Sequence, residues 1–207
     1  MYRPRENNFI YLFFSWYIST IIKKHFATVQ LTHVDVRSDA SVLLIANHFS
    51  WWDGFLLFQL NKRLFKKKFH ILVNTENYRR IKFLRHLGAF APEHHGKDLI
   101  ETLNYAGRLL DDPQNLVVIF PQGKLYSNHL KEIGFERGVE YIIKGSRRAV
   151  DVIFSATFID YFSKKKPVVY TYLKHFENEA KIDMLALKNS YNKHYEESLV
   201  KQTQLRE

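Results

Sequence analysis

The sequence predicts an α/β fold with a single domain, in which a central mixed β-sheet is covered by helices. The apolar run Val42–Ile45 is bounded by polar residues, which is typical of a buried strand, and an apolar helical segment, Gly54–Leu60, follows it. Between Lys97 and Leu110 apolar residues recur at helical spacing, directly before a second buried strand, Asn115–Phe120. The length of 207 residues suits one domain with a substantial core.

The first 28 residues are predicted to form an N-terminal helix that contacts a membrane. Phe9–Ile22 carries no charge but is shorter than the roughly twenty residues that span a bilayer. Lys23 and Lys24 follow it, where a secretory signal would have small residues. A buried helix and a helix in the membrane interface both fit this run. Basic flanks and aromatic rings favour the interface, because cations meet anionic head groups there.

Residues 29–207 are predicted to form the sheet and the helices that cover it. Alternating or continuous apolar residues predict further strands at Val29–Val36, Phe69–Val73, Val150–Phe158 and Pro167–Leu173. Helical patterns predict a short basic helix, Tyr78–Leu87, and another helix that opens at Phe135. The polar end, Ser190–Glu207, is predicted to be a surface helix or a frayed tail.

The composition restricts the possible functions. The 31 Lys and Arg residues exceed the 21 Asp and Glu residues by ten, which suits an anionic partner such as a lipid surface, nucleic acid or an acidic carrier protein. The chain has no cysteine, which excludes disulfides and a thiol nucleophile. A P-loop, a dinucleotide fingerprint, a G-x-S-x-G elbow and metal-ligand spacing are also absent, so we predict no metal site.

A histidine and a carboxylate, His48 and Asp53, lie where the strand Val42–Ile45 hands over to the following helix. Open α/β sheets bind ligands at such junctions. Five positions on a regular helix would place the two side chains about 140° apart, so they meet only if the chain turns between them. We predict that Ser50 caps the helix and supplies this turn. Asp53 would then accept the Nδ1 proton of His48 and leave Nε2 as a base.

A structural interpretation of the same residues is equally open at this point. Ser50-x-x-Asp53 fits the capping-box pattern, in which the carboxylate satisfies backbone N–H groups at the start of a helix. Under that interpretation Asp53 has no catalytic role.

A second motif, Pro121-Gln122-Gly123-Lys124, follows the strand Asn115–Phe120. Glycine lets the backbone approach a ligand closely, and successive N–H groups of such a loop can face an oxyanion or a phosphate. An ordinary tight turn after a strand is the alternative.

The two motifs together resemble the glycerolipid acyltransferases, the superfamily of lysophosphatidic acid (1-acylglycerol-3-phosphate) acyltransferases. The resemblance extends from about Ala40 to Tyr172 and consists of Asn-His followed by four residues and Asp, with Phe-Pro-Gln-Gly some seventy residues later. It implies that His48 is the general base and Asp53 orients it. It also implies that a lipid hydroxyl attacks an acyl thioester carried by coenzyme A or acyl carrier protein, with no resident cofactor.

The resemblance further implies substrate-binding positions, although several of them depart from the family pattern. These positions are Asn47, His94, Pro121, Gln122, Gly123 and Lys124. His94 stands at or near the place of an arginine that contacts the acceptor phosphate. In the second motif the usual Glu-Gly-Thr-Arg is replaced, so that Leu125 stands in place of another arginine. Lysophosphatidic acid and related glycerophosphate lipids remain the acceptors that the resemblance implies, and the departures raise the alternative of an acceptor that is not a bare phosphomonoester, such as a lyso-aminolipid.

We therefore expect a lipid O-acyltransferase at the cytoplasmic face of a membrane, peripheral or monotopic, with a lysolipid, an acyl thioester and the membrane surface as partners. Nucleic acid is not expected as a partner. The rival of another class is a non-catalytic, basic module that binds membranes or nucleic acid. An intact His48 and Asp53 argue against it, because a binding surface needs neither a base nor its orienting group.

Overall fold

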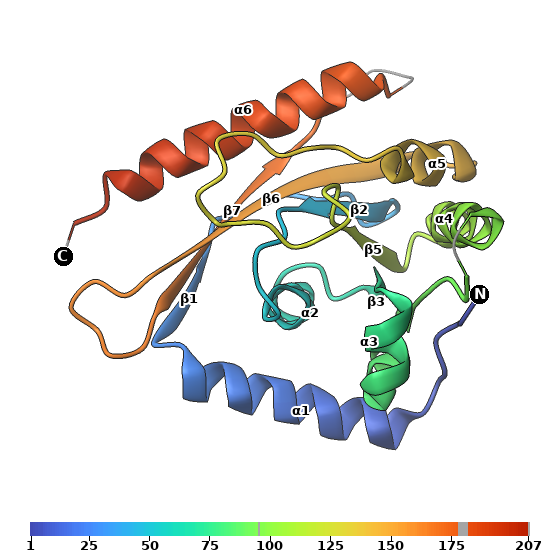
Figure 1. Cartoon of the computed structure of the whole chain (residues 1–207), viewed down its shortest axis with the longest axis horizontal. Coiled ribbons are helices and arrows are strands. Elements are labelled where there is room, and N and C mark those ends of the chain that lie inside the picture. Colours follow the sequence, from blue (N-terminus) through green and yellow to red (C-terminus); the bar gives the residue numbers. More distant parts are fainter. Residues whose placement is uncertain (95, 178–181, 207) are drawn as a thin grey trace.

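A computed structural model of the chain describes residues 1–94, 96–177 and 182–206. Its centre is a seven-stranded sheet with the order β1-β7-β6-β2-β5-β3-β4 (Figure 1). The strands are β1 (Thr28–Leu31), β2 (Ser41–Ala46), β3 (Lys68–Leu72), β4 (Ala89–Phe90), β5 (Asn115–Ile119), β6 (Val150–Asp160) and β7 (Val168–His175). Among the described strands, only the pair β6 and β7 is antiparallel, so the predicted mixed sheet in a single α/β domain is confirmed.

Helices cover both faces of the sheet (Figure 1). The described helices are α1 (Asn8–His25), α2 (Asp53–Arg63), α3 (Thr75–Arg80), the 3-10 helix η1 (Lys82–Leu87), α4 (Lys97–Leu109), α5 (Gly138–Gly145) and α6 (Met184–Thr203). Successive residues of a strand point to opposite faces. Accordingly, Val42 and Leu44 of β2 pack with α1 and α2, whereas Leu43 and Ile45 pack with α4, α5 and α6.

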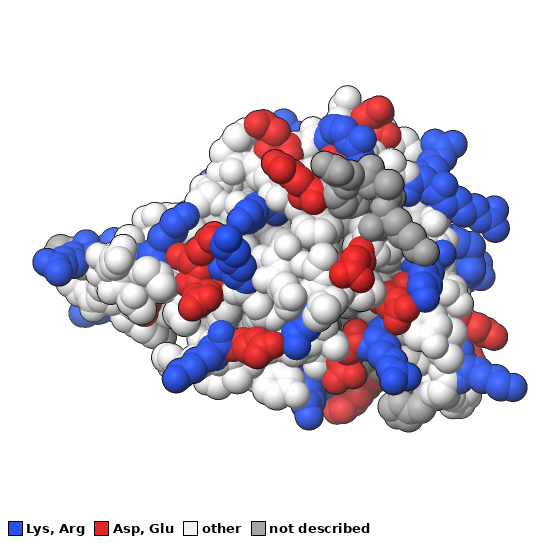
Figure 2. Space-filling model, turned by 90° about the horizontal axis from the view of Figure 1, so that it is seen from above, with Lys and Arg blue, Asp and Glu red and all other residues white. Residues whose placement is uncertain are grey.

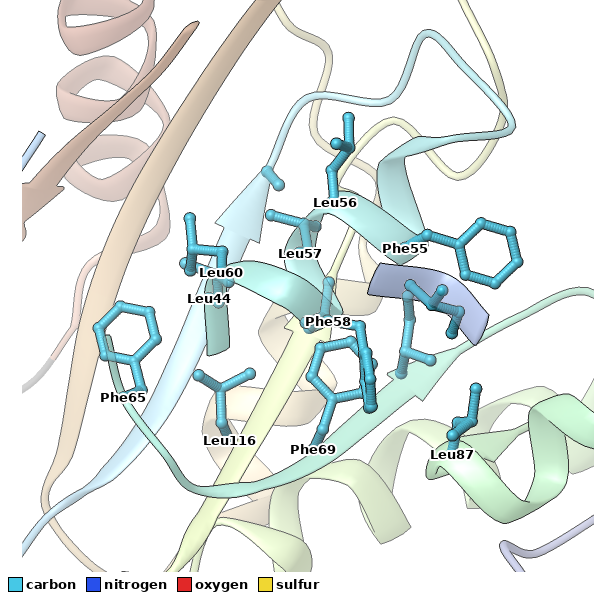
Figure 3. Packing of buried hydrophobic residues seen from close by; sticks show 14 of the residues in the cluster. Leu44, Phe55, Leu56, Leu57, Phe58, Leu60, Phe65, Phe69, Leu87 and Leu116 are labelled. Atoms are coloured by element: carbon cyan, nitrogen blue, oxygen red, sulfur yellow. The ribbon is translucent and has the colours of Figure 1, made fainter. Parts of the chain in front are cut away.

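The helix α2 is fixed firmly against the sheet. Figure 3 shows its apolar side chains beside Leu44 of β2, Phe69 of β3 and Leu116 of β5. Leu56, Leu57, Phe58 and Leu60 are each at most 4% exposed. Burial of one such side chain contributes about 1.5–3 kcal/mol. The start of α2, where Asp53 lies, is therefore held in place by the core.

The N-terminal helix α1 has both a buried face and an exposed face. Ile18 and Ile22 are buried, and Phe14 stacks on Phe83 of η1 with ring centroids 4.1 Å apart. Phe9 is 88% exposed and Trp16 is 62% exposed. A buried helix and an exposed amphipathic helix are thus not exclusive alternatives here. Within the described residues, no helix combines the length and the apolarity that are needed to cross a membrane.

Some predicted boundaries differ from the structure. The first strand ends at Leu31 instead of Val36, and the predicted helix Tyr78–Leu87 is divided into α3 and η1 at Ile81. The final helix α6 begins at Met184 and is neither a simple surface helix nor a frayed tail, because one side of it enters the core. Its buried residues are Leu187, Tyr191, His194, Tyr195, Ser198 and Gln202.

The charges are interspersed on the side of the molecule that α6 covers. Figure 2, viewed from this side, shows Lys and Arg mixed with Asp and Glu over most of the face. Lys188 pairs with Glu132 at 2.9 Å, and Lys174 lies 3.6 Å from Glu197. Among the described residues, the excess of positive charge therefore does not form one continuous patch in this view.

Acid is expected to destabilise the fold through His194 of α6. Burial lowers the pKa of His194 from its ordinary value of 6.5 to about 4, partly opposed by its bond to the carbonyl of Tyr172. The unfolded chain therefore takes up the proton first, and stability is lost as the pH falls from 6.5 toward 4. In urea titrations, acidification from pH 7 to pH 5 should cost wild type about 2 kcal/mol more than His194→Gln.

Equal losses in the two proteins would contradict this assignment. Glutamine is the appropriate substitution because its amide can still donate to the carbonyl of Tyr172, as Nε2 of His194 does at 3.0 Å. Burial also lowers the pKa of His70, which contributes equally to both proteins.

Candidate active site

His48 and Asp53 meet in the turn between β2 and α2. Nδ1 of His48 lies 2.8 Å from Oδ2 of Asp53. The same carboxylate oxygen accepts the backbone N–H groups of Phe49 at 2.8 Å and Ser50 at 2.9 Å. An oxygen that accepts this many bonds acts as a carboxylate, so Nδ1 carries the proton and donates it. The Nε2 atom of His48 is then left with a lone pair.

The turn is built differently from the predicted cap. The residue before α2 is Trp52, and the helix begins at Asp53 itself. The hydroxyl of Ser50 accepts the N–H of Trp52 at 3.1 Å, within the turn that precedes the helix. Asp53 reaches back to the N–H of Ser50, which is the carboxylate half of a capping box. Oδ2 of Asp53 therefore both caps backbone N–H groups of the turn and bonds to the imidazole of His48, so the two interpretations do not exclude each other.

Three contacts from the second motif and the residues on either side of it fix His48. The ring of Phe120 stacks on the imidazole with centroids 4.0 Å apart and an interplanar angle of 12°. The side-chain oxygen of Gln122 accepts the N–H of His48 at 2.6 Å, and the carbonyl of His48 accepts the N–H of Tyr126 at 3.0 Å. The two motifs, which are far apart in the sequence, thus form one site.

Asn47, which precedes His48, is buried, and its side chain bonds to the backbone of the fold. Its side-chain amide donates to the carbonyl of Thr157 and accepts the N–H of the same residue, both at 2.9 Å. Asn47 thereby fastens the turn after β2 to β6. This position fits a positioning role better than the substrate-binding role that was predicted. Gln122 is likewise only 4% exposed, with its side-chain oxygen on the backbone of His48.

The helix α6 also contacts the turn after β2, through Tyr191. The hydroxyl of Tyr191 donates to the carbonyl of Ser155 at 3.0 Å. Burial raises the pKa of Tyr191 well above its ordinary value, while a bond from the backbone N–H of Asn47 opposes this shift. Sequence reasoning missed Tyr191, because the polar residues around it hide the few positions of α6 that enter the core.

A cavity of about 940 Å³ opens beside His48. His48 forms part of its wall and its side chain is 24% exposed, whereas Asp53 is only 4% exposed and lies behind the imidazole. Apolar side chains from four elements line much of the cavity, including Ile18, Phe55, Phe58, Phe69, Ile71 and Leu84. The base is accessible from the cavity and its carboxylate partner is shielded, which suits proton transfer at Nε2.

The second motif contributes Pro121, Gly123 and Lys124 to the cavity wall. Gly123 has a φ of +68°, a conformation that favours glycine, and its N–H donates to the carbonyl of Phe120 at 3.1 Å. The predicted turn is therefore present, and the N–H of Gly123 is engaged within it. The following N–H groups, of Lys124 and Leu125, make no backbone bond to other described residues.

His94 lies outside the lining of this cavity and is exposed. Its nearest acidic neighbours are Glu93 and Asp98, and the ligand atoms of these three residues lie within 4.8 Å of one another. Glu93 is paired with the terminal ammonium of Met1 at 3.2 Å, and Asp98 accepts the N–H of His94 at 3.2 Å. We assign no metal role to this surface cluster.

Comparison with known proteins agrees with this architecture. The fold is similar to the crystal structure of the 1-acyl-sn-glycerophosphate (LPA) acyltransferase PlsC from Thermotoga maritima, with a TM-score of 0.67 and 12% sequence identity. The match covers 93% of this chain and 79% of the PlsC chain. No curated protein sequence matches. The model of the Acyltransferase family matches residues 28–175, from the first strand of the sheet through the last, and the chain therefore belongs to the Acyltransferase family.

Proposed function

We propose that this protein transfers a fatty acyl group from an acyl thioester to the hydroxyl of a lysolipid, such as lysophosphatidic acid. The observation that carries the proposal is the bond between His48 and the buried carboxylate of Asp53, with the imidazole facing a large, mainly apolar cavity. A positioned base and a lipid-sized cavity are the two things that this reaction needs. The similarity to an LPA acyltransferase supports the same reaction class.

The proposed reaction needs no covalent enzyme intermediate. Nε2 of His48 takes the proton of the acceptor hydroxyl while its oxygen attacks the thioester carbonyl. The bond between carbon and sulfur then breaks, and the thiolate takes the proton back from the imidazolium. The carboxylate of Asp53 stabilises the imidazolium through the bond at Nδ1. The backbone N–H groups of Lys124 and Leu125 are the candidate donors to the oxyanion.

The donor is proposed to be acyl-coenzyme A or acyl carrier protein. Either carrier brings the activated thioester with it, so the chemistry needs no resident cofactor. The apolar wall of the cavity, with Phe58 and Phe69 among its members, is proposed to hold the acyl chain. Each buried methylene of such a chain contributes about 0.8 kcal/mol.

The acceptor has two candidates within this reaction. Lysophosphatidic acid is the first because of the similarity to PlsC. A lyso-aminolipid without a phosphomonoester is the alternative, because Leu125 carries no charge and His94 does not line the cavity. A planar arginine clamp on a phosphate has no equivalent at these two positions, although Lys124 still offers a point charge.

The non-catalytic alternative is less favoured. A basic module that binds membranes or nucleic acid would explain the net charge of +10. It does not explain why His48 is held by Asp53, Phe120 and Gln122 while it lines the cavity. We therefore propose an enzyme, and no nucleic-acid partner.

We also propose that the protein is peripheral or monotopic at the cytoplasmic face of a membrane, with α1 as its contact. Phe9, Phe13 and Trp16 are 88%, 56% and 62% exposed on this helix, and Lys23 and Lys24 lie in its last turn. Aromatic side chains beside basic residues suit an anionic lipid surface.

Replacing Phe9, Phe13 and Trp16 together with serine should weaken binding to anionic lipid vesicles by about tenfold or more, because each ring then loses its burial in lipid. Co-sedimentation with vesicles measures this, and the midpoint of thermal unfolding should stay near that of wild type. Leu185→Ser is the matched control, because Leu185 is 66% exposed on α6, across the sheet from α1. Unchanged binding by the triple variant would refute the contact through α1.

The proposed function is tested by incubating the protein with a lysolipid and either acyl-coenzyme A or acyl-loaded carrier protein. Mass spectrometry then detects the diacylated product, and release of free thiol measures the rate. Formation of product with at least one donor supports the proposal. If no donor and acceptor pair gives product, the proposed function is wrong.

A further inference from the structure

The charged residues that line the cavity are balanced, although the protein as a whole is strongly basic. Among the described residues, the charged lining consists of two acidic and two basic side chains: Glu76, Glu136, Lys124 and Arg137. The chain itself carries a net charge of +10. A cavity built for an acceptor with a bare phosphomonoester would gain from a positive lining, since such a group carries up to two negative charges.

Of the two acidic residues that line the cavity, Glu136 contacts the turn that begins at Phe120. Its N–H donates to the carbonyl of Pro121 at 2.8 Å. Its Cγ atom would lie 3.3 Å from a Cβ added to Gly123. The side chain of Glu136 is thus packed over the turn that begins at Phe120, and the ring of Phe120 stacks on His48.

The carboxylate of Glu136 remains available for a ligand. It is exposed and forms no ion pair with another described residue, whereas Glu140 of the same segment is paired with Lys144 at 2.6 Å. A carboxylate in this position repels a phosphomonoester and attracts an ammonium group. A Cβ at position 123 would crowd this side chain, so glycine there lets Glu136 lie against the turn.

The two basic residues of the cavity lining belong to the same two loops as Glu136 and Gly123. Arg137 follows Glu136, and Lys124 follows Gly123, with Nζ of Lys124 lying 5.3 Å from the ring centroid of Tyr126. One acidic and two basic side chains from these two loops therefore line the same cavity. This combination matches a ligand that presents both an anionic group and an ammonium group.

We infer that the acceptor of this enzyme is a zwitterionic lysolipid, whose ammonium group is bound by Glu136 and whose anionic group is bound by Lys124 and Arg137. The inference rests on the proposed acyl transfer and specifies its acceptor. The anionic group can be a phosphodiester or a carboxylate, since both accept hydrogen bonds from these two cations.

The test is a competition assay in which equal amounts of four acceptors share one acyl donor. Lysophosphatidylethanolamine carries a phosphodiester and an ammonium group, and lysophosphatidylglycerol carries the phosphodiester alone. An N-(3-hydroxyacyl)ornithine carries an ammonium group and a carboxylate, and lysophosphatidic acid carries only the phosphomonoester. The ratio of products gives the ratio of kcat/KM values directly, whatever the amount of active enzyme.

Wild type is expected to prefer one of the ammonium-bearing acceptors over lysophosphatidylglycerol and lysophosphatidic acid by about fivefold or more. The preference should shrink in Glu136→Gln and reverse in Glu136→Lys, mainly through KM for the ammonium-bearing acceptor. The two ammonium-bearing acceptors show whether the phosphodiester or the carboxylate is the anionic partner. Glu196→Gln and Glu196→Lys are matched controls, because Glu196 is exposed on α6 and outside the cavity lining.

Two results would overturn the inference, and they are distinguishable from failure of the proposed function. A preference for lysophosphatidic acid in wild type, or a preference that the Glu136 variants leave unchanged, refutes the zwitterionic acceptor while acyl transfer stands. Absence of product from all four acceptors with both kinds of donor refutes the proposed function and this inference with it.

Discussion

Replacing His48 with alanine is expected to lower kcat for acyl transfer by about 10²- to 10⁴-fold, which is the usual contribution of a general base. The imidazole is the group that takes the proton from the acceptor hydroxyl, and alanine cannot do so. KM for the lysolipid should change little, because the other apolar and charged residues that line the cavity remain. Single-turnover rates with saturating acyl thioester measure the effect.

The fold should tolerate this substitution. Asp53 would keep the backbone N–H groups of Phe49 and Ser50 as donors to Oδ2, and the side chain of His48 is already 24% exposed. His33→Ala is the matched control, since His33 also pairs with a carboxylate, Asp35 at 2.9 Å, but its side chain is 77% exposed at the surface. A His48→Ala protein that acylates lysolipid as fast as wild type would show that His48 is not the base.

The local part of the site could be predicted from the sequence. The strand before His48 is a continuous apolar run, so the junction between strand and helix was visible in the residue pattern. The five-residue spacing required a turn, and the bond between His48 and Asp53 at 2.8 Å shows that the turn exists. These features depend on neighbours in the chain, although the spacing alone fitted a capping box equally well.

The supporting contacts could not be predicted, because they join residues far apart in the chain. Asn47 binds the backbone of Thr157, and Gln122 binds the backbone of His48. Both residues lie in motifs, and the sequence therefore suggested substrate contacts for them. Only the order of the strands, which places β2 between β6 and β5, reveals that the side-chain oxygens of both residues accept backbone N–H groups within the fold.

The two ends of the chain show the same limitation. The sequence of α1 predicted an apolar helix, but its division into a face with Ile18 and a face with Phe9 follows from packing against α2 and η1. In α6 the fully buried Tyr191 and Tyr195 are four residues apart among polar neighbours. Their rings pack on Phe154 and Phe158 of β6, and the polar residues between them hide this apolar spacing in the sequence.

Asp53→Asn is expected to lower kcat by about 10²- to 10⁴-fold while leaving KM for the lysolipid nearly unchanged. Asparagine has the same shape, but it is neutral and cannot stabilise the imidazolium that forms when His48 takes the proton. Asp53 is 4% exposed and behind the imidazole, so its substitution removes no contact with a bound lipid. The readouts are kcat and KM for wild type and variant, measured with the same thioester.

Comparison with Asp53→Ala separates the catalytic role of this carboxylate from its structural role. The amide oxygen of asparagine can still accept the N–H groups of Phe49 and Ser50, and its NH₂ replaces Oδ1, which already has no partner within the described residues. Asp53→Asn should therefore unfold at nearly the same temperature as wild type. Alanine leaves both N–H groups without this acceptor and should cost about 1–3 kcal/mol in the free energy of unfolding. If Asp53→Asn keeps most of the activity and only Asp53→Ala loses it together with stability, Asp53 serves as a cap and the proposed orienting role is wrong.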